Sequence, residues 1–287
     1  MSKASAQLAI SHPVISKTIS DLERTLGVRL FDRNSRGVEL TTYGRALLNC
    51  GMTVFDEMRQ GLKLIEFLAH PHSGELRIGC PEILTAGLLP AIVEQFSLQY
   101  PQIRLQVVHA NTALLQFEEL RKRNVDLLLG RMPRPFLEED LTAETLFDEP
   151  FVAVAGAQSP WARRRRIDLV ELLDEPWVLP PYDSVPGLLI VEIFRADNLR
   201  PPTPSMVTLA VQLTTNLIIT GRYVGLLPRS AVQFSGSRAG LKILPVKLAD
   251  QRTAVGTIMV KNRTASPLAN LFIDCAREVV KPLVKGK

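Results

Sequence analysis

The chain has 287 residues, with 46% hydrophobic and 22% charged side chains and a formal net charge of +5. This composition excludes a disordered or fibrous protein, and the length suffices for two domains with cores of their own. The mild positive charge is compatible with nucleic-acid binding without being diagnostic of it. Because the three cysteines are far apart, and no export signal or membrane-length apolar run is evident, we expect a cytoplasmic protein without disulfides or a membrane partner.

The first part of the chain, residues 1–48, is predicted to form two helices and a hairpin. Residues 4–9 supply the apolar face of a first short helix. In the second helix, Ser11 stands at the cap position and Pro13 in the first turn, where a missing N–H costs nothing. Gly27 is expected to end this helix, because glycine readily adopts the left-handed conformation found there.

An apolar stripe and two short strands complete this segment. The stripe recurs with helical spacing and consists of Ile15, Ile19, Leu22 and Leu26. Strands are expected at residues 30–33 and 38–40, joined by the turn sequence NSRG.

A long helix is predicted over residues 42–68. Its apolar positions keep the three- and four-residue spacing of a helix pair, and they include Leu48, Phe55, Met58, Leu62 and Ile65. The alternative is that this helix packs only on its own domain, but its place between two folded regions favours dimerisation. The sequence HPHSG, residues 70–74, then interrupts the pattern and is predicted to be a hinge.

From residue 75 onward, apolar strands alternate with helical stretches. Strands are expected at residues 76–80, 103–110 and 125–130, with helices at residues 83–101 and 112–124 between them. This order predicts a parallel sheet with helices on both faces. Further strands at residues 150–156 and 176–181, and a helix, turn and strand over residues 215–232, indicate a second such lobe. A small ligand is expected in the cleft between the strand ends of the two lobes.

The N-terminal residues also carry a dense motif, which consists of Leu8, Ser11, Pro13, Ser16, Leu22, Glu23, Gly27, Leu30, Phe31, Arg33, Leu40, Thr41 and Gly44. At these spacings the segment resembles the winged helix-turn-helix of the LysR-type bacterial transcriptional regulators. Looser motifs, LRIG, VDLLLGR and YVGLLP, extend the resemblance over essentially the whole chain.

This resemblance implies three parts. They are an N-terminal all-α winged helix-turn-helix (residues 1–48), a linker helix with its hinge (residues 49–73), and a C-terminal α/β two-lobed effector domain like a periplasmic binding protein (residues 74–287). We expect lobe I at residues 74–148 and 252–287, and lobe II at residues 149–251.

The resemblance makes the second helix the DNA-reading helix. The residues expected to face the major groove are those away from the apolar stripe, namely Ser11, His12, Pro13, Ser16, Lys17 and Ser20. Of these, His12 and Ser16 are placed to bond base edges, and Lys17 suits a phosphate. In the hairpin, Arg33 and Arg36 suit the neighbouring backbone or the minor groove.

Two departures from the family pattern stand out. His12 occupies the position of a glutamine, whose amide can bond adenine bidentately, so we expect a changed and pH-sensitive base preference. The family's first helix, which covers the apolar stripe, has no counterpart before residue 4. We expect a start codon further upstream, and the alternatives are a truncated chain or an impaired regulator.

Ligand contacts are implied by the same resemblance. They come from strand-end loops and comprise Cys80, Pro81, Glu82, Ile83, Asn111, Thr112, Gly130, Arg131, Pro181, Tyr182 and Asp183. A carboxylate paired with Arg131 and a sugar or sugar acid bound by Glu82, Asn111 and Asp183 are equally compatible with these residue types. Aromatic acids belong to the same set of candidate inducers.

The predicted function is therefore a ligand-responsive regulator that binds double-stranded promoter DNA as a homodimer or homotetramer and controls a catabolic operon. RNA polymerase is a partner by resemblance, and we expect an inducer but no cofactor, metal or catalytic residue. The alternative is a solute-binding protein or an effector-only remnant with impaired DNA binding. The basic run Arg163–Arg166 and the pair His70 and His72 are better explained by a solvated helix entry and a hinge than by nucleic-acid or metal sites.

Overall fold

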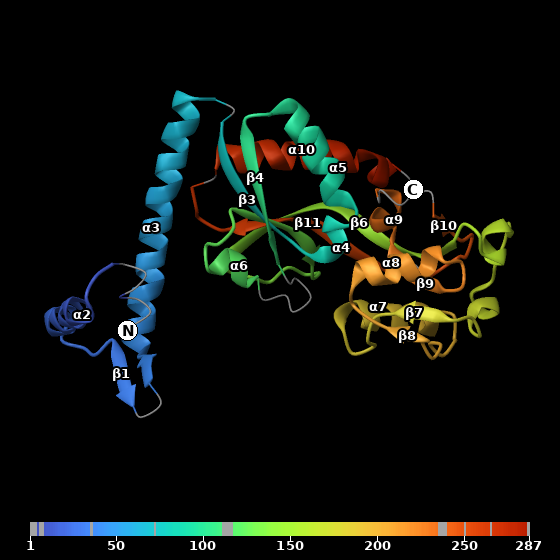
Figure 1. Cartoon of the computed structure of the whole chain (residues 1–287), viewed down its shortest axis with the longest axis horizontal. Helices are drawn as coiled ribbons and strands as arrows, with labels where there is room; N and C mark the ends of the chain where they lie inside the picture. Colours follow the sequence, from blue (N-terminus) through green and yellow to red (C-terminus); the bar gives the residue numbers. More distant parts are fainter. Residues whose placement is uncertain are drawn as a thin grey trace. The chain divides into compact units, whose positions relative to one another are not determined.

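A computed structural model describes residues 5, 9–34, 37–71, 73–110, 117–234, 240–249, 251–264 and 266–285. The chain divides into two compact units, Met1–Arg59 and Gln60–Lys287. One long helix, α3 (Thr42–Ala69), contributes residues to both (Figure 1). No helix in the described ranges combines the length and the apolarity needed to cross a bilayer.

The first unit contains the helix α2 (His12–Leu26) and a two-stranded hairpin, β1 (Phe31–Asn34) and β2 (Gly37–Leu40), before α3 begins. The predicted ends of α2 are confirmed. Ser11 occupies the N-cap position, although its side chain makes no cap hydrogen bond, and Gly27 ends the helix with a φ of 68°. The strands pair antiparallel from Phe31 opposite Leu40 to Asn34 opposite Gly37.

The motif residues Glu23, Thr41 and Gly44 hold this unit together. A carboxylate oxygen of Glu23 accepts the backbone N–H of Leu30 at 2.7 Å, which ties α2 to the start of the hairpin. The Thr41 hydroxyl donates to the Arg29 carbonyl at 2.7 Å and accepts the N–H of Gly44 at 3.0 Å. A Cβ on Gly44 would lie 2.0 Å from the Leu30 carbonyl oxygen, so only glycine permits this close approach.

The second unit contains one mixed sheet with the strand order β4-β3-β5-β11-β6-β9-β7-β8. Its lobe I strands are β3 (Gly74–Cys80), β4 (Ile103–His109), β5 (Leu127–Met132) and β11 (Arg252–Val260). The predicted parallel pairing is confirmed, because β3 runs parallel to both β4 and β5. Helices α4 (Glu82–Thr85), α5 (Leu88–Gln99), α6 (Glu118–Arg121) and α10 (Pro267–Lys285) accompany these strands.

The strand β6 (Leu141–Gly156) belongs to both lobes. Its residues 141–150 pair with β11, whereas residues 151–155 pair with β9 (Val224–Pro228). The lobe II elements are β7 (Trp177–Leu179), β8 (Met206–Val207), β10 (Leu241–Ile243), α7 (Val185–Ala196), α8 (Val211–Ile219), α9 (Arg229–Gln233) and the short helices η1 (Pro160–Arg163) and η2 (Leu169–Leu172). One continuous strand therefore connects the two lobes.

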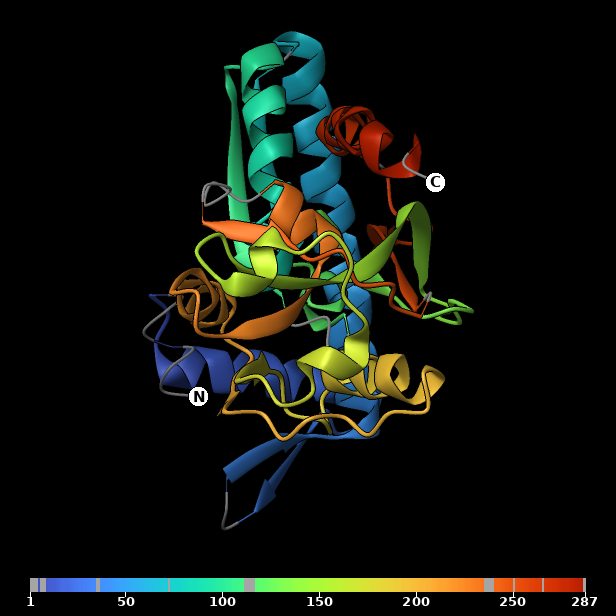
Figure 2. The ribbon, with the colours of Figure 1, turned by 90° about the vertical axis from the view of Figure 1, so that its right-hand side faces the viewer.

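Side chains alternate between the two faces of each strand, so each lobe has a separate core on each face of its sheet. In β6, Phe151 and Ala153 belong to the core that α7 covers, and Val154 belongs to the one that α8 covers. The turned view in Figure 2 also shows these two helices apart, with lobe II strands between them. In lobe I, α5 and α10 pack together over one face, as Figure 1 shows.

Some expectations about elements were wrong in detail. The helix predicted over residues 83–101 is broken into α4 and α5 at Gly87, whose Cβ position lies 2.7 Å from the Cα of Ala231 in α9. Of the helix predicted over residues 112–124, the structure shows α6 alone, and residues 111–116 lie outside the described part. The strand predicted over residues 150–156 is the second half of the longer β6.

Candidate DNA-binding helix and effector pocket

The polar face of α2 is accessible within its unit. Of the residues predicted to read DNA, Ser11, His12, Pro13, Lys17 and Ser20 are exposed and Ser16 is half-buried. On the other side of the helix, Ile15 and Ile19 are half-buried, and Leu22 is 40% exposed. Arg33 lies in β1, but its side chain lies outside the described part, and Arg36 lies outside the described residues altogether.

The predicted dimer face of α3 is also accessible. Its residues Leu48, Phe55, Met58, Leu62 and Ile65 have exposed fractions between 48% and 73%. Such a row of large apolar side chains along one helix is typical of an interaction surface.

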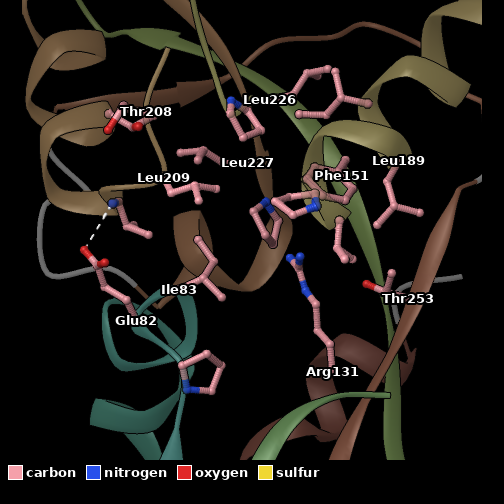
Figure 3. A pocket seen from close by; sticks show the side chains of 18 of the residues that line it. Glu82, Ile83, Arg131, Phe151, Leu189, Thr208, Leu209, Leu226, Leu227 and Thr253 are labelled. Atoms are coloured by element: carbon pink, nitrogen blue, oxygen red, sulfur yellow. Dashed lines mark hydrogen bonds between the residues drawn. The ribbon is translucent and has the colours of Figure 1, made fainter. Parts of the chain in front are cut away.

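A cavity of about 430 Å³ opens among strand ends and helix starts of both lobes. Lobe I contributes residues at the ends of β3, β4 and β5 and the start of β11, and lobe II contributes residues from β6, β7, β9, α7 and the start of α8. Most of its wall is apolar and includes Ile83, Phe151, Leu189, Ile190, Leu209, Leu226 and Leu227 with several prolines (Figure 3). We call this cavity the interlobe pocket.

Arg131 is the charged residue that points into the interlobe pocket from the end of β5 (Figure 3). Its guanidinium carbon lies 5.4 Å from the centre of the Phe151 ring. Two of its nitrogens, Nε and Nη2, are buried and donate no hydrogen bond to any residue that the structure describes. Burial lowers the pKa of Arg131, while the charge of Glu149 opposes that shift. The guanidinium nevertheless stays protonated at neutral pH.

Glu149 is fully buried, and its carboxylate accepts hydrogen bonds from Ser230. Its carboxylate accepts the backbone N–H of Ser230 at 3.0 Å and also the Ser230 hydroxyl. Burial raises the pKa of Glu149, and the bonds from Ser230 work against this rise. The carboxylate thus anchors the start of α9 and supplies only a nearby charge to Arg131.

Glu82 joins the two lobes across the interlobe pocket. Its carboxylate accepts the backbone N–H of Val211 at 3.1 Å, the dashed line in Figure 3. Val211 is the first residue of α8, so this carboxylate caps a helix N-terminus whose dipole favours negative charge. The side chain predicted to bind a sugar is therefore already engaged within the protein.

Only part of the predicted ligand set lies on the pocket wall. Pro81, Glu82, Ile83 and Arg131 line it, whereas Cys80, Gly130, Pro181, Tyr182 and Asp183 do not. Asn111 and Thr112 lie outside the described residues.

The remaining predicted residues support neighbouring elements instead. Cys80 is part of the lobe I core, where burial raises the pKa of its thiol, and Gly130 pairs with Gly256 in the sheet. Tyr182 donates its hydroxyl to the Pro202 carbonyl at 2.5 Å, and burial raises its pKa to about 12. The Pro181 carbonyl accepts the hydroxyl of Ser184 at 2.6 Å, and Asp183 is exposed.

Several wall residues carry no recognisable signal in the sequence. Phe151, Leu189 and Leu226 are apolar and resemble any other core position, and Thr253 lies in a strand more than a hundred residues further along than β5. The Thr253 hydroxyl is buried and lacks a hydrogen-bond partner among the described residues.

A second buried charge lies at the opposite end of β5. Asp126 is 3% exposed, and its carboxylate pairs with Lys63 at 2.8 Å, Arg77 at 3.2 Å and Arg263 at 3.3 Å. It also accepts the backbone N–H of Arg77 at 3.0 Å. Although burial opposes ionisation, the hydrogen bonds from Lys63 and Arg77 lower the pKa of Asp126 to about 2.

Two family models match the chain. One is the lysR family of bacterial regulatory helix-turn-helix proteins, over residues 1–45, and the other is the LysR substrate binding domain, over residues 69–281. The chain is 30% identical over 261 residues to the transcriptional dual regulator GltC of Bacillus subtilis (strain 168), covering 91% of this chain and 85% of that protein. It is 26% identical to the regulator PcaQ of Agrobacterium fabrum, covering 99% and 91% respectively.

Solved structures show the same fold. A full-length OxyR variant from Pseudomonas aeruginosa superposes with a TM-score of 0.68 at 22% identity, covering 96% of this chain and 89% of that one. Full-length CbnR in complex with its target DNA gives a TM-score of 0.58 at 20% identity, with 97% and 93% covered.

Proposed function

The chain belongs to the LysR family of bacterial transcriptional regulators, and on this premise we propose that it binds promoter DNA through α2 and responds to a small effector held in the interlobe pocket. One observation carries the proposal: a pocket of about 430 Å³ with walls from both lobes lies in a chain whose α2 keeps its polar face exposed. Pockets of this size between lobes are typical small-molecule sites.

In this proposal His12 and Ser16 bond base edges, while Lys17 contacts a phosphate. The exposed apolar row of α3 supports a homodimer or homotetramer, which would present two copies of α2 to a two-fold symmetric operator. We also propose that the DNA-binding domain ends at residue 48 and that the effector domain begins after residue 73.

The cellular setting is also part of the proposal. Relatives such as GltC and PcaQ are transcriptional regulators, so we place this protein in the cytoplasm beside the chromosome. We further propose that it controls a catabolic operon and that its partner on the promoter is RNA polymerase.

A gel-shift titration with the DNA upstream of the chain's own gene tests the proposal. We expect binding in the wild type, and for Lys17→Ala a loss of about tenfold in affinity, with a salt dependence shallower by about one phosphate contact. The control is Lys281→Ala, which removes the same charge from the exposed face of α10.

Two results would contradict the proposal. One is a wild-type protein that shifts no DNA but still binds a small molecule, which would favour the solute-binding alternative. The other is an equal loss of affinity in both lysine variants, which would show that Lys17 contributes only net charge.

A further inference from the structure

Apart from His109, which is exposed, the polar side chains on the wall of the interlobe pocket fall into two classes. Three are already engaged within the protein: Glu82 accepts the N–H of Val211, and Thr208 and Thr214 bond the backbone of Ala210. Two are not engaged with any described residue, the guanidinium atoms Nε and Nη2 of Arg131 and the hydroxyl of Thr253. Figure 3 shows both of these side chains on the lobe I side of the pocket.

The unengaged N–H donors of Arg131 indicate which chemical group of a ligand would bind them. Its Nε and Nη2 atoms form one edge of the guanidinium, and two parallel N–H donors of this kind match the two oxygens of a carboxylate. Glu149, whose charge acts on Arg131, does not fill this role, because its carboxylate accepts its hydrogen bonds from Ser230. A buried cation without such a partner is unfavourable, so its retention favours an anion supplied from outside.

The rest of the pocket wall indicates that the part of the ligand beyond its anionic group is apolar. Phe151 lies beneath the guanidinium, and Ile83, Leu189, Leu209 and Leu226 provide no hydrogen-bonding side chain. Each hydroxyl of a sugar placed against such a wall would lose its bonds to water without replacement. The engagement of Glu82 and the exposed position of Asp183 remove two of the three side chains that a bound sugar would need.

We propose that the effector is a small carboxylate with an apolar ring or branched body, whose carboxylate binds Arg131 and the Thr253 hydroxyl. This inference rests on the proposed function, because it names the ligand class of the same pocket. Sugars and sugar acids, which the sequence left open, are excluded by it.

The test is calorimetric titration of the purified full-length chain without DNA. Benzoate, cyclohexanecarboxylate and 2-methylbutanoate are the probes, and each is compared with its alcohol: benzyl alcohol, cyclohexylmethanol and 2-methylbutanol. Gluconate supplies an anion with a polyhydroxylated body. We expect at least one carboxylate to bind, and its alcohol and gluconate to bind at least about a hundredfold more weakly.

Variants identify the residues. Arg131→Gln should reduce carboxylate affinity at least about a hundredfold, and Thr253→Val should reduce it several-fold with the side-chain shape retained. The control Arg166→Gln removes an exposed arginine outside the pocket and should leave the affinity unchanged. A thermal melt of each unliganded variant verifies folding, and Thr253→Val keeps the test valid if the Arg131 variant does not fold.

The possible results test the proposed ligand class and the proposed function independently. Failure of all three carboxylates at about 10 mM, equal binding of an alcohol or gluconate, or full affinity in Arg131→Gln would overturn the ligand class even if promoter DNA is bound. Carboxylate binding that Arg131→Gln abolishes, in a chain that ignores promoter DNA, would uphold the ligand class and overturn the proposed function.

Discussion

Two buried charges lie at opposite ends of the strand β5, and they differ in how many partners they have within the protein. Asp126 precedes the strand and is paired with three cations from α3, β3 and the segment before α10. Arg131, near the other end, has two buried nitrogens without a hydrogen bond to any described residue. Asp126 thus has its ionic partners within the protein, as expected of a structural charge. Arg131, on the pocket wall, has N–H donors that a ligand could bind.

The largest expected difference concerns stability. Asp126→Ala leaves Lys63, Arg77 and Arg263 together without their anion, so we expect the free energy of unfolding to fall by about 3–5 kcal/mol. Arg131→Gln removes an unsatisfied cation and should leave that free energy unchanged or raise it. Urea denaturation of both variants measures the difference, and a larger loss in Arg131→Gln would reverse the two roles.

The second difference is in pH dependence. The native pKa of Asp126, about 2, lies below its ordinary value of 3.8, so the ionised carboxylate stabilises the fold above about pH 4. That contribution, about 2 kcal/mol, is lost as the pH falls from about 4 through 2. Denaturation between these pH values should show a steeper loss in the wild type than in Asp126→Asn. Parallel curves would contradict the assignment.

A smaller effect is expected from the acid near the pocket. Glu149→Gln keeps a hydrogen-bond acceptor for Ser230 but removes the negative charge that acts on Arg131. We expect the unfolding free energy to fall by about 1–2 kcal/mol and carboxylates to bind more tightly, because a competing anion is gone. Ser230→Ala is the matched control, since it loses a hydrogen bond and retains the charge. Tighter carboxylate binding in both variants would show that the charge of Glu149 is not the cause.

A further effect, comparable in size, tests whether the cations around Asp126 contribute unequally to stability. Lys63 is one of three partners and its side chain is 17% exposed, so Lys63→Met should cost about 1.5 kcal/mol, less than Asp126→Ala. Arg263, whose side chain is 6% exposed, should cost more when replaced by Met. Equal losses for the two variants would show that burial does not rank these partners.

The same two charges show how far the sequence can predict the site. Arg131 lies at the end of a recognisable apolar strand, and the family resemblance implies ligand contacts at such strand ends, so the sequence predicts it as a candidate. The partners of Asp126 come from residues as distant as Lys63 and Arg263, and no local pattern connects them. Periodicity describes one element at a time, and this cluster exists only after the sheet and α3 have assembled.

Helix α2 and the wall of the interlobe pocket also differ in how far local sequence predicts them. The ends of α2 follow from local chemistry, because a proline near the start and Gly27 after the end act within a few residues. Phe151 and Thr253 reach the pocket because β6 crosses between the lobes and β11 returns beside it. That long-range pairing is not encoded in any short motif.

The most direct test of the contrast is an NMR titration of the full chain with 15N-labelled arginine. The Nε–H signal of Arg131 is assigned by its absence in Arg131→Gln. We predict that this signal shifts on addition of cyclohexanecarboxylate and stays in place with cyclohexylmethanol, while the signals of Arg77 and Arg263, held by Asp126, do not move. A stationary Arg131 signal in a protein that binds the carboxylate would contradict its role as the anion receptor.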